Sequence, residues 1–336
     1  MKIAQNELVS ILEKITKATA TRPTLPVLAY VGFDGENRRA HCTDLSTWIF
    51  AEMPALDFSA CVPGRLLLDL VKTMNGMIEI EPREDTLLVS AGRHESTVKT
   101  MPFSEMPFLS SEPDGWRDAP DGILASIDKV AFCAARDESR PALTGVLVSN
   151  NGTIAAADGF RLATTGAVDG VIVPASALSI LPSLFKGEQV QQSTGANQIA
   201  FRAGSVMVVS QLIDGKYPQV EQIIPKQYEA RLEFTAGEAL FALKTVLVLS
   251  DDSKIVTVSR NGDKIHLAAH NENGEAESEF YAAGGDFGPF AVNGAYLRDA
   301  MAAMVKIEMR INTPSSPILL VEEEYRHVIM PMQVRK

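Results

Sequence analysis

The stretch Ala156-Ala157-Asp158-Gly159-Phe160-Arg161-Leu162-Ala163-Thr164-Thr165 has two counterparts in the same chain, CTDLSTW at 42–48 and AAHNENGEAE at 268–277. In each, an apolar strand-like run ends at a polar residue, Asp158, Asp44 or Asn271, and a second strand-like run follows. The three recur about every 113 residues, a far longer interval than the ~20–50 residues of a solenoid repeat. Tandem triplication of a whole domain therefore explains the length of 336 residues.

Other landmarks repeat with these turns. Three short sequences each begin an apolar helical stretch: Val62-Pro63-Gly64, Val173-Pro174-Ala175 and Val292-Asn293-Gly294. Ala91-Gly92 and Ala203-Gly204 are matching turn signals, each followed ~15 residues later by a proline, Pro107 or Pro218. Repeated domains more often build an extended surface or a ring than a single catalytic pocket.

Each repeat is predicted to run helix, strands, helix, strands, which makes the fold class α+β. Glu7–Ala18 shows the helical spacing at Leu8, Ile11, Leu12 and Ile15. The other helices are predicted over 65–74, 122–136, 174–186, 237–250 and 294–306, with Pro182 shortening or kinking the fourth. Asn261-Gly262, between two alternating runs, predicts a hairpin, and Asn151-Gly152 and Asp34-Gly35 occupy similar positions. Domain boundaries are expected in 110–118 and 225–228, giving domains 1–112, 113–226 and 227–336.

The composition is that of a soluble globular protein with a net charge of −11, which argues against a simple basic nucleic-acid-binding module. Cys42, Cys61 and Cys133 have neither disulfide-framework nor zinc-ligand spacing, so we expect reduced core residues in a cytoplasmic protein. The amino-terminal segment lacks a signal-peptide core, and no run approaches the ~18 apolar residues of a membrane span.

Basic residues outnumber acidic ones in the predicted helical stretches, whereas the rest of the chain is strongly acidic. The ten basic positions are Lys14, Lys17, Arg65, Lys72, Lys129, Arg136, Lys186, Lys244, Arg298 and Lys306. Ordinary solvated helix faces explain this pattern as readily as a basic surface that holds a polyanion.

Enzyme signatures are missing from the sequence. The acidic runs at Asp251-Asp252 and Glu322-Glu323-Glu324 lack the spacing of a metal-binding loop, and the histidines form no HExxH pattern. There is no P-loop, dinucleotide fingerprint or nucleophile elbow either. The sequence thus predicts a non-catalytic protein without a cofactor or metal.

Four collinear segments resemble the bacterial DNA polymerase III beta subunit family, the sliding clamps. They are Arg22-Pro23-Thr24-Leu25-Pro26-Val27-Leu28, Asp158–Ala163, Ser210–Pro218 (SQLIDGKYP) and Val328-Ile329-Met330-Pro331-Met332. The resemblance spans the whole chain in the family's order and implies the DNA clamp fold: three similar domains, each with two helices on antiparallel sheets. It also implies a head-to-tail homodimeric ring around duplex DNA, contacted without sequence preference.

The resemblance further implies a cleft that receives linear peptides from the polymerase catalytic subunit, the clamp loader and repair polymerases. Its expected residues are Leu143, Gly159, Phe160, Arg161, Leu162, Pro225, Asn293, Tyr296, Ser316, Ile329, Met330, Pro331 and Met332. Apolar side chains and adaptable methionines suit leucine and phenylalanine anchors. Leu162, Ile329 and Met330 are equally compatible with ordinary core positions.

Two further sets follow from the resemblance and from helix placement. The expected DNA-facing residues are Arg22, Arg140, Lys14, Lys17, Lys72, Lys129, Arg136, Lys244 and Arg298. Val248 and Leu249 match the family's apolar pair at the dimer interface, although an internal core is an alternative for both.

The chain also departs from the family pattern. Ala175-Ser176 stand where a basic residue is frequent, and Phe160 and Ala157 replace the usual histidine and threonine. These differences keep open a second possibility, a clamp-like paralogue or mobile-element clamp that binds partners without supporting the main replicase.

Overall fold

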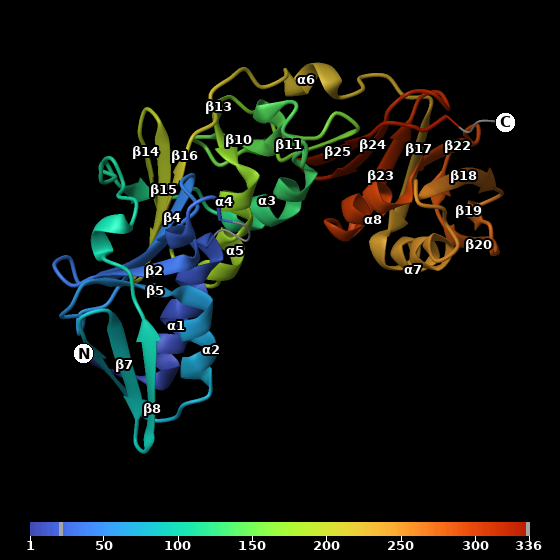
Figure 1. Ribbon diagram of the computed structural model, residues 1–336. Helices are drawn as coiled ribbons and strands as arrows, with labels where there is room; N and C mark the ends of the chain where they lie inside the picture. The colour runs from blue at the N-terminus through green and yellow to red at the C-terminus, as the bar shows by residue number, and fades with distance from the viewer. Residues whose placement is uncertain (20–22, 334–336) are drawn as a thin grey trace. The chain divides into compact units, whose positions relative to one another are not determined.

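The computed structural model describes residues 1–19 and 23–333, which form two compact units. The first comprises Met1–Ala119 and Ile180–Leu212, and the second Pro120–Ser179 and Ile213–Lys336. Figure 1 shows the helices and strands of both units. The predicted middle domain, 113–226, supplies strands to both units, so the compact units do not follow the expected domain boundaries.

The first unit is built on two antiparallel sheets and three helices. The eight-stranded sheet has the order β5-β2-β3-β4-β16-β15-β14-β9, and the four-stranded sheet β1-β6-β7-β8. The strands are β1 Lys2–Ala4, β2 Tyr30–Asp34, β3 Arg39–Thr43, β4 Thr47–Glu52, β5 Ala60–Pro63, β6 Met77–Pro82, β7 Thr86–Ala91, β8 His94–Lys99, β9 Arg117–Asp118, β14 Gln191–Thr194, β15 Gln198–Ala203 and β16 Val206–Gln211. The helices are α1 Gln5–Ile15, α2 Gly64–Lys72 and α5 Leu181–Leu184.

The second unit has the same construction. One sheet has the order β13-β10-β11-β12-β25-β24-β23-β17-β21, and the other β20-β19-β18-β22. The strands are β10 Gly145–Ser149, β11 Ile154–Ala157, β12 Arg161–Thr164, β13 Gly170–Pro174, β17 Ala230–Thr235, β18 Ile255–Asn261, β19 Lys264–Asn271, β20 Gly274–Tyr281, β21 Ala283–Gly284, β22 Phe290–Asn293, β23 Lys306–Ile311, β24 Ile318–Glu322 and β25 Tyr325–Ile329. The helices are α3 Ile123–Val130, α4 Ala175–Ser179, α6 Val220–Ile223, α7 Ala236–Leu247 and α8 Gly294–Ala302.

The repeated polar residue has the same structural role in all three copies. Asp44 Oδ1 accepts from the backbone N–H groups of Ser46 and Thr47, at 3.0 and 2.8 Å. Asp158 Oδ1 accepts from the N–H groups of Phe160 and Arg161, both at 2.9 Å, and Asn271 Oδ1 accepts from Asn273 at 2.8 Å. Because a short side chain supplies the missing backbone acceptor, each strand can turn directly into the next.

Helix amphipathicity places the cores as expected. In α1, Leu8, Leu12 and Ile15 are buried, and in α2 Leu67 and Val71 are buried. The helix predicted around Pro182 is interrupted: α4 ends at Ser179 and α5 begins at Leu181, as a proline within a helix requires.

The α-helices end before the predicted helical stretches do, and α3 and α8 show the largest differences. Helix α3 stops at Val130, and a short 3-10 helix, Ala131–Cys133, follows it, so Arg136 lies outside the helix. Helix α8 stops at Ala302, and Lys306 begins strand β23. The prediction that basic residues outnumber acidic ones on the helices is therefore wrong. Four of the basic residues counted there lie outside the α-helices: Lys17, Arg136, Lys186 and Lys306.

Candidate functional site

The expected cleft residues gather around the pairing of β12 with β25 in the second unit. Arg161 lies opposite Ile329 and Leu162 opposite Val328, and the Met330 N–H donates to the Phe160 carbonyl at 2.9 Å. The chain then crosses to β22, where the Met332 N–H donates to the Ala291 carbonyl at 2.7 Å. The strand pairing thus holds Phe160 and the Met330–Met332 segment in fixed positions.

The expected cleft residues fall into two groups, those exposed at the surface and those buried behind it. Phe160 is 62% exposed and Met330 41%, which makes both available to a ligand. Leu143, Leu162 and Ile329 are at most 5% exposed. Leu162 packs in a core cluster with Leu143 and Val328, so the core alternative raised for Leu162 and Ile329 fits their burial. These side chains support the wall from behind.

A groove of ≈ 690 Å³ runs beside the carboxy-terminal segment. Its lining is mostly apolar: Thr257, Pro289, Phe290, Ala291, Pro314, Ser315, Met330, Pro331, Met332 and Gln333. Ser315 lines this groove, whereas the expected Ser316 is half-buried and its Oγ lies 2.6 Å from Thr313 Oγ1. Two methionines beside prolines and an aromatic ring form a surface that can adapt to an apolar side chain.

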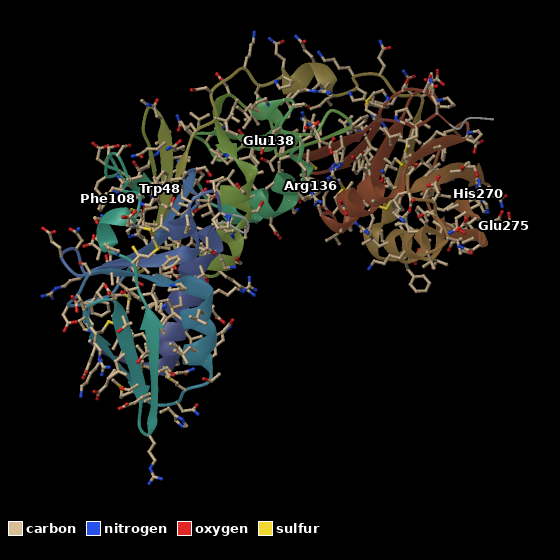
Figure 2. All side chains as sticks on the ribbon, in the orientation of Figure 1. Trp48, Phe108, Arg136, Glu138, His270 and Glu275 are labelled. Carbon is tan, nitrogen blue, oxygen red and sulfur yellow. The ribbon has the colours of Figure 1, made fainter. Side chains whose placement is uncertain are left out.

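A second hollow of ≈ 510 Å³ joins two sets of residues that the sequence treated as separate. Leu143, Phe160, Arg161 and Tyr296 come from the expected cleft. Arg136, Arg140 and Arg298 come from the expected DNA-facing set. Figure 2 shows Arg136 beside Glu138 in the loop after α3. Asp137, Asp158 and Asp299 also line this hollow, so positive and negative groups alternate around it.

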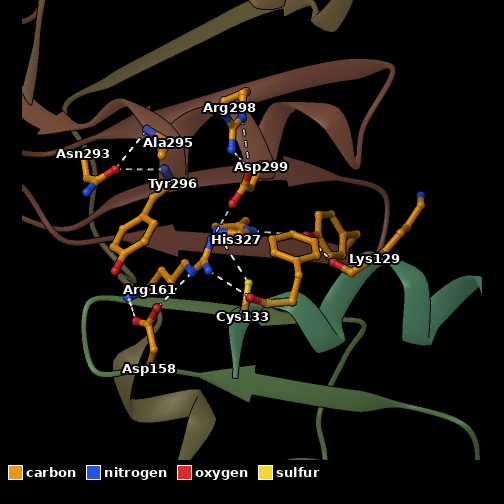
Figure 3. A network of polar contacts seen from close by, with 12 residues as sticks. Lys129, Cys133, Asp158, Arg161, Asn293, Ala295, Tyr296, Arg298, Asp299 and His327 are labelled. Atoms are coloured by element: carbon orange, nitrogen blue, oxygen red, sulfur yellow. Dashed lines mark hydrogen bonds and ion pairs between the residues drawn. The ribbon is translucent and has the colours of Figure 1, made fainter. Parts of the chain in front are cut away.

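Arg161 is the centre of a polar network that ties the predicted second domain to the third (Figure 3). Its Nε donates to Asp158 Oδ2 and its Nη1 to Asp299 Oδ2, both at 3.0 Å, and its Nη2 donates to the Phe132 carbonyl at 2.9 Å. The guanidinium also lies 4.3 Å from the Tyr296 ring centroid. With its side chain only 10% exposed, Arg161 serves structure more than ligand contact.

A neutral histidine lies next to this network. His327 is fully buried, and burial followed by the nearby Arg161 charge lowers its pKa from 6.5 to about 3. The Tyr325 hydroxyl donates to the Lys129 carbonyl at 2.9 Å and lies 3.1 Å from His327 Nδ1. Cys133 Sγ lies 4.0 Å from His327 Nε2, and burial raises the pKa of this thiol. An uncharged imidazole is the only form this packing accommodates without a further partner.

The remaining expected cleft residues have different local roles. Asn293 caps α8, since its Oδ1 accepts from the N–H groups of Ala295 and Tyr296 at 2.9 and 3.2 Å. Gly159 has a left-handed backbone, with φ of 93°, and a Cβ there would lie 3.2 Å from Arg140 Nη1. Pro225 is half-buried and lines neither hollow.

Several expected DNA-facing residues already have partners. Lys72 Nζ lies 2.7 Å from Glu13 Oε1, Lys129 Nζ lies 3.6 Å from Glu322 Oε2, and Arg298 Nη2 lies 2.8 Å from Asp299 Oδ1. Lys17 donates to Ser183 Oγ at 3.1 Å. Lys244 and Arg140 are exposed and Lys14 is half-exposed, while Arg22 lies outside the described residues. The local positive field is therefore weaker than a count of lysines and arginines implies.

Several large apolar side chains are exposed on the two units. Val248 is 77% exposed at the end of α7, and Leu249 beside it is half-buried. Phe241 on the same helix is 77% exposed, and Phe108 of the first unit is 63% exposed (Figure 2). Sequence reasoning missed these phenylalanines; Phe241 interrupts the polar face of its helix, which is the signal that could have identified it.

Metal-binding groups and membrane-spanning helices were sought in the described residues as well. In the described ranges, no group of three His, Cys, Asp or Glu side chains is arranged to hold a metal ion. No described helix is long and apolar enough to cross a membrane. Cys42, Cys61 and Cys133 are free and buried, and burial raises the pKa of each thiol.

Comparison with known families matches three consecutive domains of the DNA polymerase III beta subunit. The N-terminal domain matches residues 1–110, the central domain 120–219 and the C-terminal domain 221–333. Curated relatives include the beta sliding clamps of Staphylococcus aureus, 24% identical over 343 residues, and Staphylococcus epidermidis, 25% identical over 348 residues. For both, the alignment covers 92% of this chain and 91% of the relative.

Solved structures give the same result. The DNA polymerase sliding clamp of Pseudomonas aeruginosa superposes with a TM-score of 0.85 at 25% identity, covering 99% of both chains. A putative DNA polymerase III beta subunit from Eubacterium rectale has a TM-score of 0.89 at 16% identity and covers 99% of each chain, which supports the fold alone.

Proposed function

The chain belongs to the DNA polymerase III beta subunit family, the sliding clamps, and from this premise we propose that two copies close head-to-tail into a ring around duplex DNA. The family is a non-catalytic processivity factor. The observation that carries the proposal is the run of three consecutive family domains over one chain. The paralogue alternative is not favoured, because the curated relatives named above are beta sliding clamps.

The sheet topology supports ring closure by a second copy. Two junctions between predicted domains are antiparallel pairings of edge strands, β4 with β16 and β12 with β25. Strands β8 and β20 occupy the corresponding ends of their sheets and have no strand beside them in the described chain. Unpaired edges of this kind are normally covered. We propose that β8 of one copy pairs with β20 of the next, beside Val248 and Leu249.

The partner site is proposed on the surface formed by Phe160, Tyr296, Met330, Pro331 and Met332. Exposed apolar groups there suit the anchors of an extended peptide, and the backbone around Met330 offers further hydrogen bonds. Partners of this class are the polymerase catalytic subunit, the clamp loader and repair polymerases. Leu143, Leu162 and Ile329 would hold the wall in place, and Gly159, Arg161, Asn293, Pro225 and Ser316 would shape its margins.

Contact with DNA is proposed to be loose and independent of sequence. Lys14, Lys244, Arg136 and Arg140 have accessible charges, Lys17 donates to the Ser183 hydroxyl, and Lys72, Lys129 and Arg298 share their charges with acidic neighbours. Long side chains that touch phosphates give many positions of nearly equal energy, which permits sliding. We also propose domain boundaries near 112 and 226 and a cytoplasmic location, as befits a replication protein with buried thiols.

The first property to test is whether the protein encircles DNA. The protein should be loaded onto nicked circular DNA with a clamp loader and then challenged by linearisation. A dimer retained on circles and lost from linear DNA is the expected result. Equal retention on both forms would overturn the encircling ring, and a monomer by light scattering would overturn the dimer.

The peptide surface requires a separate test. Met330→Ala combined with Met332→Ala removes two flexible side chains from the groove while leaving the β12–β25 pairing in place. We expect titration calorimetry with a polymerase-derived peptide to show at least a tenfold loss of affinity. Val305→Ala, an exposed valine elsewhere in the unit, is the matched control. Unchanged affinity in the methionine variant would place the peptide elsewhere.

A further inference from the structure

Internal repetition fixes equivalent positions in the three pairs of edge strands. Asp44, Asp158 and Asn271 begin the turns into β4, β12 and β20. The hairpins that lead into β8, β16 and β25 each contain a left-handed residue at the same place: Gly92, Gly204 and Glu323, with φ of 59°, 53° and 52°. Residues in different repeats can therefore be compared by their distance from these two markers.

The two junctions inside the chain have the same register. Thr47, three residues after Asp44, lies opposite Ser210, six residues after Gly204. Arg161, three residues after Asp158, lies opposite Ile329, six residues after Glu323. A backbone hydrogen bond repeats as well: Gln211 N–H to the Ser46 carbonyl at 2.8 Å, and Met330 N–H to the Phe160 carbonyl at 2.9 Å.

We propose that ring closure uses this register, which places Gly274 opposite Val98 of a second copy, and that a like-charged pair within it opposes closure. The inference rests on the head-to-tail ring proposed above and adds its register and its electrostatics. Counting outward from Gly274 and Val98 sets Glu275 opposite Thr97, Glu277 opposite Glu95, and Glu279 opposite Arg93. Glu95 and Glu277 are both exposed, so two carboxylates meet across the new strand pair.

The equivalent positions inside the chain carry different chemistry. Glu95–Glu277 corresponds to Met207–Phe50 in one junction and to Arg326–Thr164 in the other. Thr97–Glu275 corresponds to Val209–Trp48 and to Val328–Leu162. At the Thr97–Glu275 position both in-chain junctions have apolar pairs, and at the Glu95–Glu277 position one has an apolar pair while the other has Arg326 opposite Thr164, so only the closing pair sets two like charges opposite each other. Figure 2 shows Glu275 with His270 at the hairpin of β19 and β20.

The charged groups around Glu277 offset only part of its repulsion from Glu95. His266 Nε2 lies 3.4 Å from Glu277 Oε2, while Lys264 is paired with Glu279 on the same face. Arg93 opposite Glu279 gives one favourable pair. Like charges directly opposite each other in a sheet are destabilising. The outer face of the closing sheet therefore makes the ring easier to open there than at either junction inside the chain.

The affinity of the dimer reports the repulsion between Glu95 and Glu277 directly. Glu95→Gln should tighten the dimer about 2- to 5-fold for each junction, and the effect is squared because a two-copy ring has two identical junctions. Glu277→Gln should act in the same direction, with the double variant gaining less than the sum of the two. Glu81→Gln, an exposed change of equal charge two strands from the edge, is the control. An unchanged or weaker dimer in Glu95→Gln, measured by sedimentation at low salt, would overturn the proposal.

Cross-linking tests the register and separates it from the ring itself. Ser96→Cys with Ala276→Cys should form an intermolecular disulfide on mild oxidation, because the register sets these small residues opposite each other on the other face. Ser96→Cys with Ser278→Cys, two residues out of register, should not. The native thiols do not compete, since all three are buried. A cross-link in the second pair alone would refute the register, whereas the absence of both cross-links and of a dimer would refute the ring.

Discussion

Arg161 combines three hydrogen bonds with the face of Tyr296, and the chemistry of guanidinium explains why. A lysine at this place would carry the same charge but could not reach Asp158, Asp299 and the Phe132 carbonyl together. We predict that Arg161→Lys lowers the free energy of unfolding by about 2–4 kcal/mol, since a buried charge network loses its geometry.

The control for this prediction uses the same carboxylate. Arg298 also pairs with Asp299, but its side chain is 45% exposed, and such surface pairs are worth about 0–1 kcal/mol. Urea unfolding of Arg161→Lys and Arg298→Lys should therefore give clearly different midpoints. Equal midpoints would mean that Arg161 is only a surface residue.

His327 makes stability depend on pH. Its pKa is about 3 in the folded protein and about 6.5 when unfolded, so between these values the unfolded chain binds the extra proton. Stability is therefore complete above pH 6.5 and falls as the pH drops towards 3, by up to ~1.4 kcal/mol per pH unit. His41, whose pKa burial lowers to about 4, adds a similar slope in the first unit.

His327→Phe tests this assignment. Chemical denaturation between pH 7.5 and 5 should show a shallower loss of stability in the variant, by about one proton, although its stability at neutral pH is lower. Val305→Phe, a change at a 73% exposed valine of the same unit, removes no titratable group and should leave the slope unchanged. A wild-type slope in His327→Phe would show that the imidazole is not held neutral.

Among the secondary-structure elements, the turns were predictable from the sequence, whereas the helix ends were not. The repeated Asp44, Asp158 and Asn271 and the proline at 182 act through local backbone chemistry, so their effects were predictable. Helix α8 ends early because strand β23 begins at Lys306, and helix α3 ends early because the 3-10 helix Ala131–Cys133 follows it; local periodicity indicates neither change. In the candidate site, the segments were predictable, but the division into exposed Phe160 and buried Ile329 depends on sheet packing far along the chain.

The backbone of Leu45 is strained in the turn between β3 and β4. It follows Asp44 with φ of 78°, a conformation in which an ordinary side chain crowds the backbone, while Gly159 occupies the equivalent place in the second repeat. Leu45 is 41% exposed, so truncation loses apolar contacts as well as strain, and two truncations must be compared. Leu45→Gly should be more stable than Leu45→Ala by about 0.5–1 kcal/mol, because both lose the side-chain contacts and only glycine relieves the strain, and Gly159→Ala should lower the free energy of unfolding. Thermal unfolding that shows the opposite order would contradict the strain argument.

For the whole molecule, a net charge of −11 and accessible basic side chains are compatible because the two act at different ranges. At physiological salt, charges further apart than about 8 Å are largely screened, so DNA responds to the side chains it touches more than to the total. In the proposed ring, retention depends on closure, so the exposed apolar groups beside its closing strands, Val248 among them, matter more than any single basic side chain.

Val248→Lys tests that dependence. At 77% exposure the substitution costs the folded chain little, but in the ring it would bury a charge against the apolar surface of a second copy. We expect monomers at micromolar concentration by sedimentation velocity, with unchanged thermal unfolding of the chain. Val305→Lys, 73% exposed on the same unit, should remain a dimer. If both variants stay dimeric, α7 lies outside the interface, and β8 and β20 must close the ring without the apolar contact that Val248 and Leu249 predict.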